Sequence, residues 1–168
     1  ITYGSHCFPE YNKRGFGLIG YEDAFRVSSN TFFYQIGVGV GSKALYDAAI
    51  KLGFDNYTGI ETLIDENKGL VGNEEWANKG RGWGNPGETP WIVEDMASAS
   101  IGQSVVLVTP LQLARAYAVF ANGGYLITPH LVDGNNNWRS EKYFKKVDIK
   151  ETTLDTIRRG LRKVVTNG

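Results

Sequence analysis

One predicted helix restricts the possible folds of this chain more than any other segment. Thr109 and Pro110 supply an N-cap followed by a proline at the first helical position, and Asn122 with the two glycines after it ends the helix. Between these signals, residues 111–121 carry apolar side chains at helical spacing on nearly every face. Such a helix needs other elements around it, so we expect it to be buried nearly all round and central to a hydrophobic core.

The rest of the chain is predicted to be mostly helical, with a small amount of β-structure. Residues 125–132 and 138–149 flank a strong turn signal, Asp-Gly-Asn-Asn-Asn at 133–137, which suggests a small hairpin or paired extended segments. The glycine-rich residues 3–20 are expected to be a loop, and the turn-rich residues 54–90 are expected to be irregular. Helices are predicted where apolar residues recur at helical spacing near capping or stop residues: 22–27, 31–38, 43–52, 73–77, 91–99 and 152–165.

Charge and metal-ligand counts exclude several classes of function. Eighteen Lys and Arg residues balance eighteen Asp and Glu residues, which gives no overall electrostatic case for a nucleic-acid partner. Basic residues gather on one face of the last predicted helix (Arg158, Arg159, Arg162, Lys163), but such a face is usually solvated. A single cysteine and two histidines can form neither an internal disulfide nor a zinc site, so no metal is expected.

Length and composition predict a single domain over residues 1–168. The hydrophobic share of 42% is enough for one ordinary core, and no apolar window approaches the length of a membrane span. The chain begins with Ile1 rather than Met, and its last basic helix stops at a helix-ending Asn-Gly pair. We therefore expect a partial domain that belongs to a longer protein.

Residues 15–20, Gly-Phe-Gly-Leu-Ile-Gly, match the G-x-G-x-x-G pattern of dinucleotide-binding folds. That motif requires a buried strand before it, whereas residues 9–14 are polar and contain a proline. No acidic residue near positions 35–40 is available to hold a ribose. The pattern therefore favours a glycine-rich turn over a nucleotide site.

Ser28, Ser29 and Asn30 place polar chemistry between two apolar helical segments. A hydroxyl and a carboxamide at this point can project together into a cleft. The same residue types are also preferred helix N-caps, and the tripeptide alone favours that structural interpretation. The surrounding sequence has to decide between the two.

Two ordered blocks of sequence supply that context. The first is residues 28–37, which begin Ser-Ser-Asn-Thr and end Gln-Ile-Gly. The second consists of residues 100–103, 108–124 and 129–132. The first block resembles the second active-site motif of class B penicillin-binding proteins, especially the elongation-type penicillin-binding protein 2 group. The second block is similar to the segment that these proteins carry between their second and third motifs, and the resemblance covers most of residues 12–132.

The resemblance implies a fold of the α+β class. It implies the mostly α-helical central part of a penicillin-binding-protein and serine β-lactamase-like transpeptidase domain, with a minor antiparallel β element. These enzymes act through the motifs S-x-x-K, S-x-N and K-[TS]-G. Only the middle motif occurs in this chain, since no serine precedes a lysine by three residues and no K-T-G or K-S-G is found. The resemblance therefore implies that the nucleophile lies before Ile1 and the third motif after Gly168.

Ser28 and Asn30 are the catalytic and substrate-binding residues that the resemblance implies. Ser28 would belong to the relay that carries a proton to the leaving amide nitrogen. Asn30 would hydrogen-bond the backbone of the donor peptide and the catalytic lysine. Neither is the nucleophile, and this serine chemistry calls for no cofactor.

The implied function is a D,D-transpeptidase that cross-links peptidoglycan stem peptides through an acyl-enzyme and is acylated by β-lactam antibiotics. The fragment alone is expected to be inactive. The parent is expected to be anchored in the cytoplasmic membrane with this domain on the outer, periplasmic side, alongside a glycan polymerase and elongation-complex proteins. Two alternatives remain open: a non-catalytic module that binds peptidoglycan or a partner, and a β-lactam sensor or β-lactamase relative.

Overall fold

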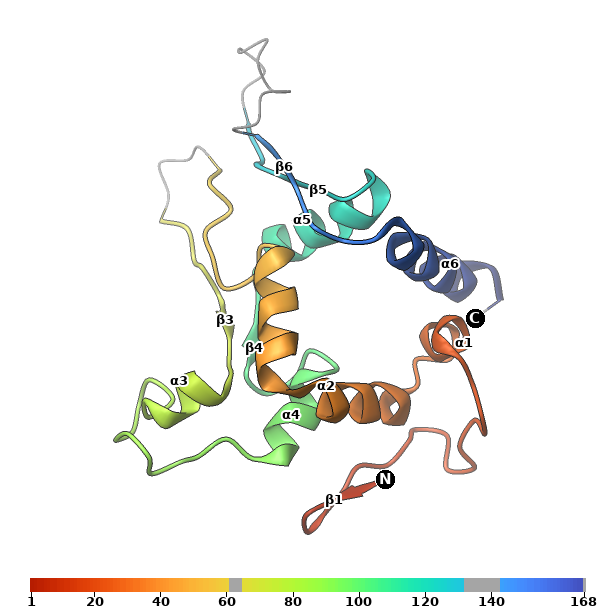
Figure 1. Ribbon diagram of the computed structural model, residues 1–168, viewed down its shortest axis with the longest axis vertical. Helices are drawn as coiled ribbons and strands as arrows, with labels where there is room; N and C mark the ends of the chain where they lie inside the picture. Colours follow the sequence, from red (N-terminus) through yellow and green to blue (C-terminus); the bar gives the residue numbers. More distant parts are fainter. Residues whose placement is uncertain (61–64, 132–142, 168) are drawn as a thin grey trace.

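The chain forms a helix-rich structure in which short antiparallel strand pairs connect the helices (Figure 1). The computed structural model describes residues 1–60, 65–131 and 143–167. Its elements are, in order, β1 (Thr2–Tyr3), β2 (His6–Cys7), α1 (Tyr21–Arg26), α2 (Asn30–Lys51), β3 (Leu70–Val71), α3 (Glu74–Asn78), α4 (Val93–Ala99), β4 (Val106–Leu107), α5 (Pro110–Ala121), β5 (Tyr125–Ile127), β6 (Phe144–Lys146) and α6 (Glu151–Asn167). The predicted α+β class, mostly helical with a minor antiparallel β element, is confirmed. Within these residues, no helix has both the length and the apolar composition of a membrane span.

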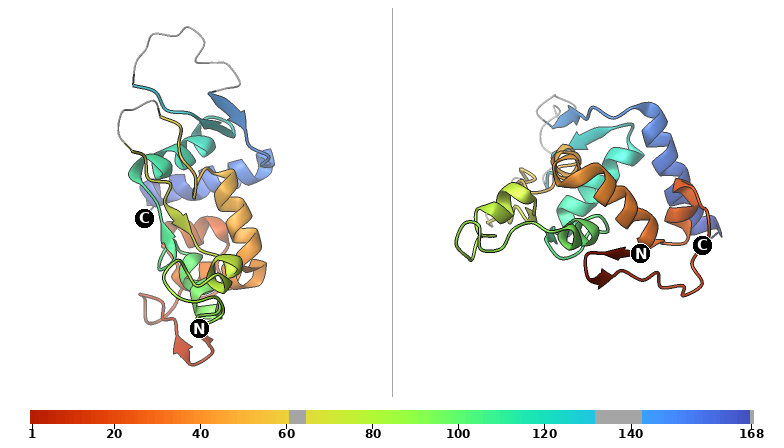
Figure 2. Two further views of the ribbon diagram at one scale, coloured as in Figure 1. Left: turned by 90° about the vertical axis from the view of Figure 1, so that its left-hand side faces the viewer. Right: turned by 60° about the horizontal axis from the view of Figure 1, so that its bottom comes forward.

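The strand pairs are partly as predicted. β5 pairs with β6 in antiparallel register, which confirms the expected pairing, whereas the turn predicted at residues 133–137 lies outside the described residues. β3 pairs with β4, and this pair was not predicted. β1 and β2 form a small hairpin within the predicted N-terminal loop, at the opposite end of the molecule from β5 and β6 (Figure 2). Strands of two residues are too short to show an alternating pattern in the sequence.

α2 joins two segments that the sequence predicts as separate helices. Its backbone leaves the helical region at Gly41, where φ is 82° and ψ is 164°. The helix changes direction there, which is visible in Figure 1 between its brown and gold parts. A positive φ is accessible to glycine without a steric penalty, so Gly41 permits this bend. The bend lies between the two helices that the sequence predicts.

α5 begins and ends as predicted, but its burial differs from the expectation. Thr109 and Gln112 form a capping box, with Pro110 at the start of the helix. Ala116 and Val119 are buried, whereas Leu113 and Tyr117 are 44% and 52% exposed. The prediction of a helix buried nearly all round is therefore wrong. The described elements pack against one side of α5 and leave an apolar face uncovered.

Gln112 links α5 to two distant segments. Its buried side-chain nitrogen donates to the carbonyl oxygens of Asn56 and Lys68, each at 2.7 Å, and its oxygen accepts from the Thr109 N–H at 2.8 Å. We expect Gln112→Leu to lower the free energy of unfolding by about 3 kcal/mol, because three backbone groups lose their hydrogen bonds to a fully buried side chain, each worth about 1 kcal/mol. Chemical denaturation measures this change. Gln35→Leu is the control, since exposed Gln35 makes a single bond to its own helix; an equal loss in both variants would contradict the prediction.

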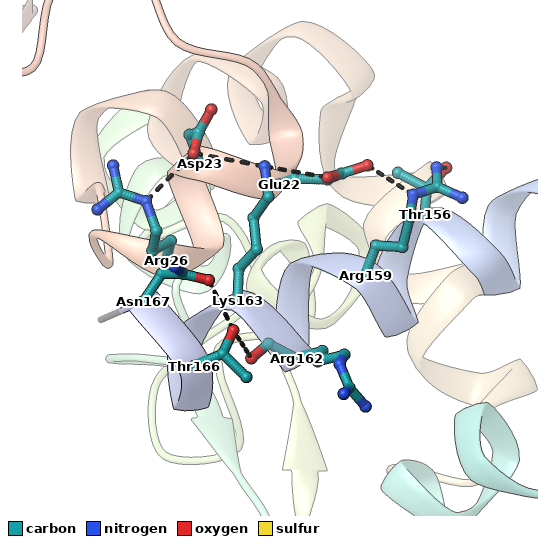
Figure 3. A network of polar contacts seen from close by, with 9 residues as sticks. All are labelled: Glu22, Asp23, Arg26, Thr156, Arg159, Arg162, Lys163, Thr166 and Asn167. Atoms are coloured by element: carbon teal, nitrogen blue, oxygen red, sulfur yellow. Dashed lines mark hydrogen bonds and ion pairs between the residues drawn. The ribbon is translucent and has the colours of Figure 1, made fainter.

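α6 packs against α1 through a steric fit and a network of charges (Figure 3). A Cβ at Gly160 would lie 2.5 Å from the ring of Phe25, so only glycine allows this close approach. Glu22 accepts from Arg159 at 2.7 Å and pairs with Lys163 at 3.1 Å. Hydrogen bonds from Arg159 and then Lys163 hold the pKa of Glu22 below its ordinary value. Two residues of the basic face of α6, Arg159 and Lys163, thus pair with acidic residues of α1.

The prediction of a solvated basic face holds for Arg159 and Arg162, which are exposed, and is wrong for Arg158 and Lys163, which are partly buried. Besides Arg159 and Lys163, Arg158 donates to the carbonyl of Phe120 at 2.6 Å and joins α6 to α5. Arg162 is exposed, as predicted. The periodicity places these residues on one face, but it carries no information about the acidic partners on α1.

The buried apolar residues form small clusters at helix contacts. Val119, Leu126 and Val147 make one cluster between α5, β5 and the segment after β6. α2 and α4 meet where Gly37 contacts Ser100 and Met96. These contacts fix the position of α2, whose N-terminus carries the predicted site residues.

Candidate active site

Ser28 occupies the left-handed position that ends α1. Its φ is 51°, and the N–H groups of Ser28 and Ser29 donate to the carbonyls of Phe25 and Ala24 at 3.1 and 3.0 Å. This pair of bonds defines a Schellman motif, in which glycine is usual at the position of Ser28. A serine there costs backbone strain, and its side chain is exposed.

Ser29 performs the capping role that the sequence analysis weighed for the whole tripeptide. Its hydroxyl accepts from the N–H of Phe32 at 3.3 Å, and the residue is only 2% exposed. Asn30 is the first residue of α2 and is partly buried. The structural and functional interpretations of the tripeptide therefore apply to different residues, because the buried middle serine caps α2 and its two neighbours remain available.

The side chains of Ser28 and Asn30 are uncommitted within the described part of the chain. Neither the Ser28 hydroxyl nor the Asn30 carboxamide takes part in a hydrogen bond among these residues. The structure thus brings a free hydroxyl and a free carboxamide to one helix junction, two residues apart. Such groups can donate to and accept from a peptide backbone.

Aromatic side chains hold the junction between α1 and α2. The rings of Tyr21 and Phe32 lie 5.1 Å apart and nearly perpendicular, and Phe25 and Phe33 are also 5.1 Å apart. Phe32 and Phe33 contact each other at 5.4 Å. Aromatic contacts of this kind fix the angle between the two helices and therefore the path of the Ser28–Asn30 turn.

Glu10 is the residue at this site that the sequence analysis missed. Its carboxylate accepts from the Ser29 hydroxyl at 2.7 Å, the Thr31 hydroxyl at 2.9 Å, and the N–H groups of Thr31 and Asn30 at 3.2 and 3.3 Å. About twenty residues separate Glu10 from these donors, so no local spacing signals the contact. Only the tertiary structure identifies it.

A cavity of about 350 Å³ lies beside the first turns of α2, next to the Ser28–Asn30 turn. Another cavity, of about 510 Å³, lies away from this turn, between α2 and α3. The smaller cavity brings the glycine-rich segment next to the site. Its lining consists of Phe16, Gly17, Leu18, Ile19, Ser29, Thr31, Phe32, Gln35 and Ile36. Gly15 and Gly17 have positive φ angles, and Gly20 is the N-cap of the short helix α1. The segment is thus a glycine-rich turn, as the sequence favours over a nucleotide site.

Serine acyl-transfer chemistry and metal chemistry require different residues. Among residues 1–60, 65–131 and 143–167, no group of three His, Cys, Asp or Glu side chains is arranged to hold a metal ion. The residues at the junction are hydroxyls, a carboxamide and one carboxylate. This set suits hydrogen bonding to a peptide and the transfer of a proton.

Known proteins share both the sequence and the fold of this chain. The family described as "Penicillin binding protein transpeptidase domain" matches residues 1–168. Peptidoglycan D,D-transpeptidase MrdA of Acinetobacter baumannii is 34% identical over 128 residues, which cover 76% of this chain and 18% of the relative. MrdA of Escherichia coli is 30% identical over 125 residues, which cover 74% of this chain and 19% of the relative. The chain thus spans about a fifth of the length of these relatives.

A solved structure agrees with the sequence match. Penicillin-binding protein 2 of Helicobacter pylori, in complex with MreC, superimposes with a TM-score of 0.84 at 27% identity, covering 99% of this chain and 29% of that chain. The similarity extends over β1–β2 at one end and α6 at the other, so it includes the junction that holds Ser28 and Asn30. Sequence and fold together show that this chain belongs to the penicillin-binding protein transpeptidase domain family.

Proposed function

We propose that this chain supplies the second active-site motif of a serine-type D,D-transpeptidase that cross-links peptidoglycan stem peptides. The observation that carries the proposal is the pair of uncommitted side chains, Ser28 and Asn30, at a helix junction within a chain that matches this family over its whole length. We propose that the nucleophilic serine and the K-[TS]-G motif come from sequence outside the 168 residues. On this proposal, residues 1–168 are one part of a single transpeptidase domain.

The proposed chemistry assigns separate tasks to the two residues. The nucleophilic serine of S-x-x-K attacks a peptide carbonyl, and the C–N bond then breaks to leave an acyl-enzyme. The nucleophile's proton passes through the lysine and the Ser28 hydroxyl to the departing amide nitrogen. The Asn30 carboxamide hydrogen-bonds the backbone of the donor peptide and the lysine. A β-lactam would acylate the same serine by opening its ring.

The comparisons also support proposals about partners and location. The Helicobacter pylori relative is described in complex with MreC. A second similar structure, with a TM-score of 0.80 at 28% identity, is described as a peptidoglycan synthase complex that coordinates polymerization and crosslinking. We propose that the parent of this chain works with elongation-complex proteins and a glycan polymerase, anchored in the cytoplasmic membrane with this domain on the outer, periplasmic side.

The proposal is tested on the full-length protein with a fluorescent penicillin. We expect a stable covalent adduct, and peptide mapping should place it on a serine of an S-x-x-K motif outside the 168 residues. The adduct should persist, because a transpeptidase releases penicillin slowly whereas a β-lactamase hydrolyses it.

Other outcomes separate the alternatives. An adduct on Ser28 or Ser29 would contradict the proposed roles. Rapid net hydrolysis of penicillin would identify a β-lactamase relative. A full-length protein that forms no adduct and binds peptidoglycan would be the non-catalytic module.

A further inference from the structure

We propose that Glu10 is a positioning residue for the second motif: its carboxylate fixes the N-terminus of α2 and thereby orients Ser28 and Asn30 for acyl transfer. The inference rests on the proposed function and deepens it. Glu10 lies in the segment between β2 and α1, outside the three motifs that define the family's chemistry.

The contacts of Glu10 cover three consecutive residues of the motif region. Oε2 accepts from the hydroxyls of Ser29 and Thr31 and from the Thr31 N–H, while Oε1 accepts from the Asn30 N–H. The Ser29 hydroxyl, which donates to Glu10, also accepts from the N–H of Phe32, so the position of Glu10 affects the first turn of α2 as well. One carboxylate therefore sets the backbone directly before and after the Asn30 side chain.

α2 lacks a negative charge of its own at this end. Its first turn contains no acidic residue, unlike those of α1, α3, α4 and α6. A helix N-terminus has unpaired N–H groups and a partial positive charge, and a carboxylate there is stabilising. Glu10 supplies this charge from a distant part of the chain. Because it occupies the N–H groups of Asn30 and Thr31, recognition of a peptide at this point depends on the side chains of Ser28 and Asn30.

Aromatic packing places Glu10 at this position. Phe8 lies edge-on to Tyr34 of α2 with ring centroids 5.1 Å apart, and Tyr34 is only 7% exposed. Phe8 also contacts Tyr3 of β1, with ring centroids 6.0 Å apart. The segment that carries Glu10 is therefore docked on α2 by its own apolar contacts. Aromatic packing and hydrogen bonds thus act together to place the carboxylate at the N-terminus of α2.

The charge of Glu10 makes the arrangement sensitive to pH. Burial alone would raise the pKa of Glu10, but the hydrogen bonds from Ser29 and Thr31 outweigh it and leave the pKa below its ordinary value. The stabilisation is therefore present above the pKa of the unfolded chain and is lost as the pH falls through the pKa of the folded state. Tyr34 is the titratable group that faces Glu10; burial, and then the charge of Glu10, raises the pKa of Tyr34. Within the described residues Glu10 forms no ion pair.

The test is the rate of acylation by benzylpenicillin in the full-length protein, per folded molecule and as a function of pH. Glu10→Gln keeps the shape of the side chain but removes its charge and replaces one acceptor oxygen with an NH2 group, which is a donor. We expect acylation at neutral pH to be about 10- to 100-fold slower, because a small misplacement of active-site groups has an effect of this size. We also expect this variant to lose the part of the acid decline that lies below the ordinary pKa of a glutamate, since it has no carboxylate to protonate there; the decline caused by protonation of the catalytic lysine remains.

Glu66→Gln is the matched control. Glu66 is another partly buried carboxylate that accepts from backbone N–H groups, those of Thr58 at 2.7 Å and Gly59 at 3.2 Å. Burial would raise the pKa of Glu66 as well, but hydrogen bonds from Thr58 and Gly59 outweigh it and lower the pKa. Glu66→Gln should acylate at the wild-type rate with the acid decline intact. A purely structural role for Glu10 predicts that both variants lose stability and keep the same pH profile.

Thr31→Val provides a second variant if Glu10→Gln does not fold. It removes one donor to the carboxylate and keeps the charge, so acylation should slow several-fold with the acid decline retained. A wild-type rate in either folded variant would overturn the proposal. Failure of the proposed function looks different, because the wild-type protein itself would then form no penicillin adduct.

Discussion

Replacing Ser28 by alanine is expected to slow acylation of the full-length protein by benzylpenicillin by about 10²- to 10⁴-fold, the usual effect of removing a proton-transfer group. The Ser28 side chain is exposed and makes no hydrogen bond within the described residues, so its loss removes no structural contact. The free energy of unfolding should therefore stay within about 0.5 kcal/mol of the wild-type value. Stopped-flow acylation and chemical denaturation measure the two quantities.

Ser28→Gly sharpens this prediction because it changes stability and activity in opposite directions. Ser28 has a φ of 51° at a position where glycine is unstrained. We expect the glycine variant to be about 1 kcal/mol more stable than wild type and to acylate as slowly as the alanine variant. Such a result would mean that the hydroxyl is retained at the expense of backbone strain. Wild-type acylation in both variants would contradict a role for Ser28 in proton transfer.

Gly37→Ala is expected to produce the other large effect, on stability. A Cβ built on Gly37 would come closer to the Cβ of Ser100 than two such atoms approach in real proteins. The side chain of Met96 would also lie in contact with this Cβ, at 3.5 Å. α2 and α4 would have to separate, and overpacking of this kind destabilises by about 1–3 kcal/mol. Because α2 carries Asn30 at its start, acylation should slow as well. Thermal and chemical denaturation measure the loss of stability.

Two further variants make this prediction specific. Gly39→Ala lies on the same helix with no heavy atom within 4 Å of the new Cβ, so it should stabilise by up to about 1 kcal/mol through helix propensity. Ser100→Gly removes the atom that the new Cβ of Gly37→Ala would meet. The double variant Gly37→Ala/Ser100→Gly should therefore be less destabilised than the sum of its parts by about 1 kcal/mol or more. Additive effects would show that the contact between α2 and α4 is not the cause.

The helix boundaries could be predicted from the sequence, whereas the roles of Ser28 and Asn30 stay predictions. Thr109 and Pro110 start α5 as expected, and Asn73 caps α3. These signals depend on hydrogen bonds between residues three or four positions apart, which the sequence shows directly. The resemblance of residues 28–37 to a known motif likewise selected Ser28 and Asn30. The resemblance gave Ser29 no role, and only the structure shows that Ser29 caps α2.

Burial and charge partners could not be predicted in the same way. The apolar face of α5 that carries Leu113 and Tyr117 is exposed, although the pattern predicts burial nearly all round. The basic face of α6 is paired with Glu22 and Asp23, although such faces are usually solvated. In both cases the pattern defines a face, whereas the neighbour of that face is set by packing between distant segments.

By itself, the sequence determined which segments are helical, which turns need glycine, and which family motif lies between α1 and α2. Only the tertiary structure decided how the motif is held: Ser28 in a left-handed turn, Ser29 buried as a cap, and Glu10 bonded to three consecutive residues. The physical reason is the range of the interactions. Capping and periodicity act within a few residues, whereas the carboxylate of Glu10 contacts residues about twenty positions away, in a part of the fold where Phe8 also packs against Tyr34.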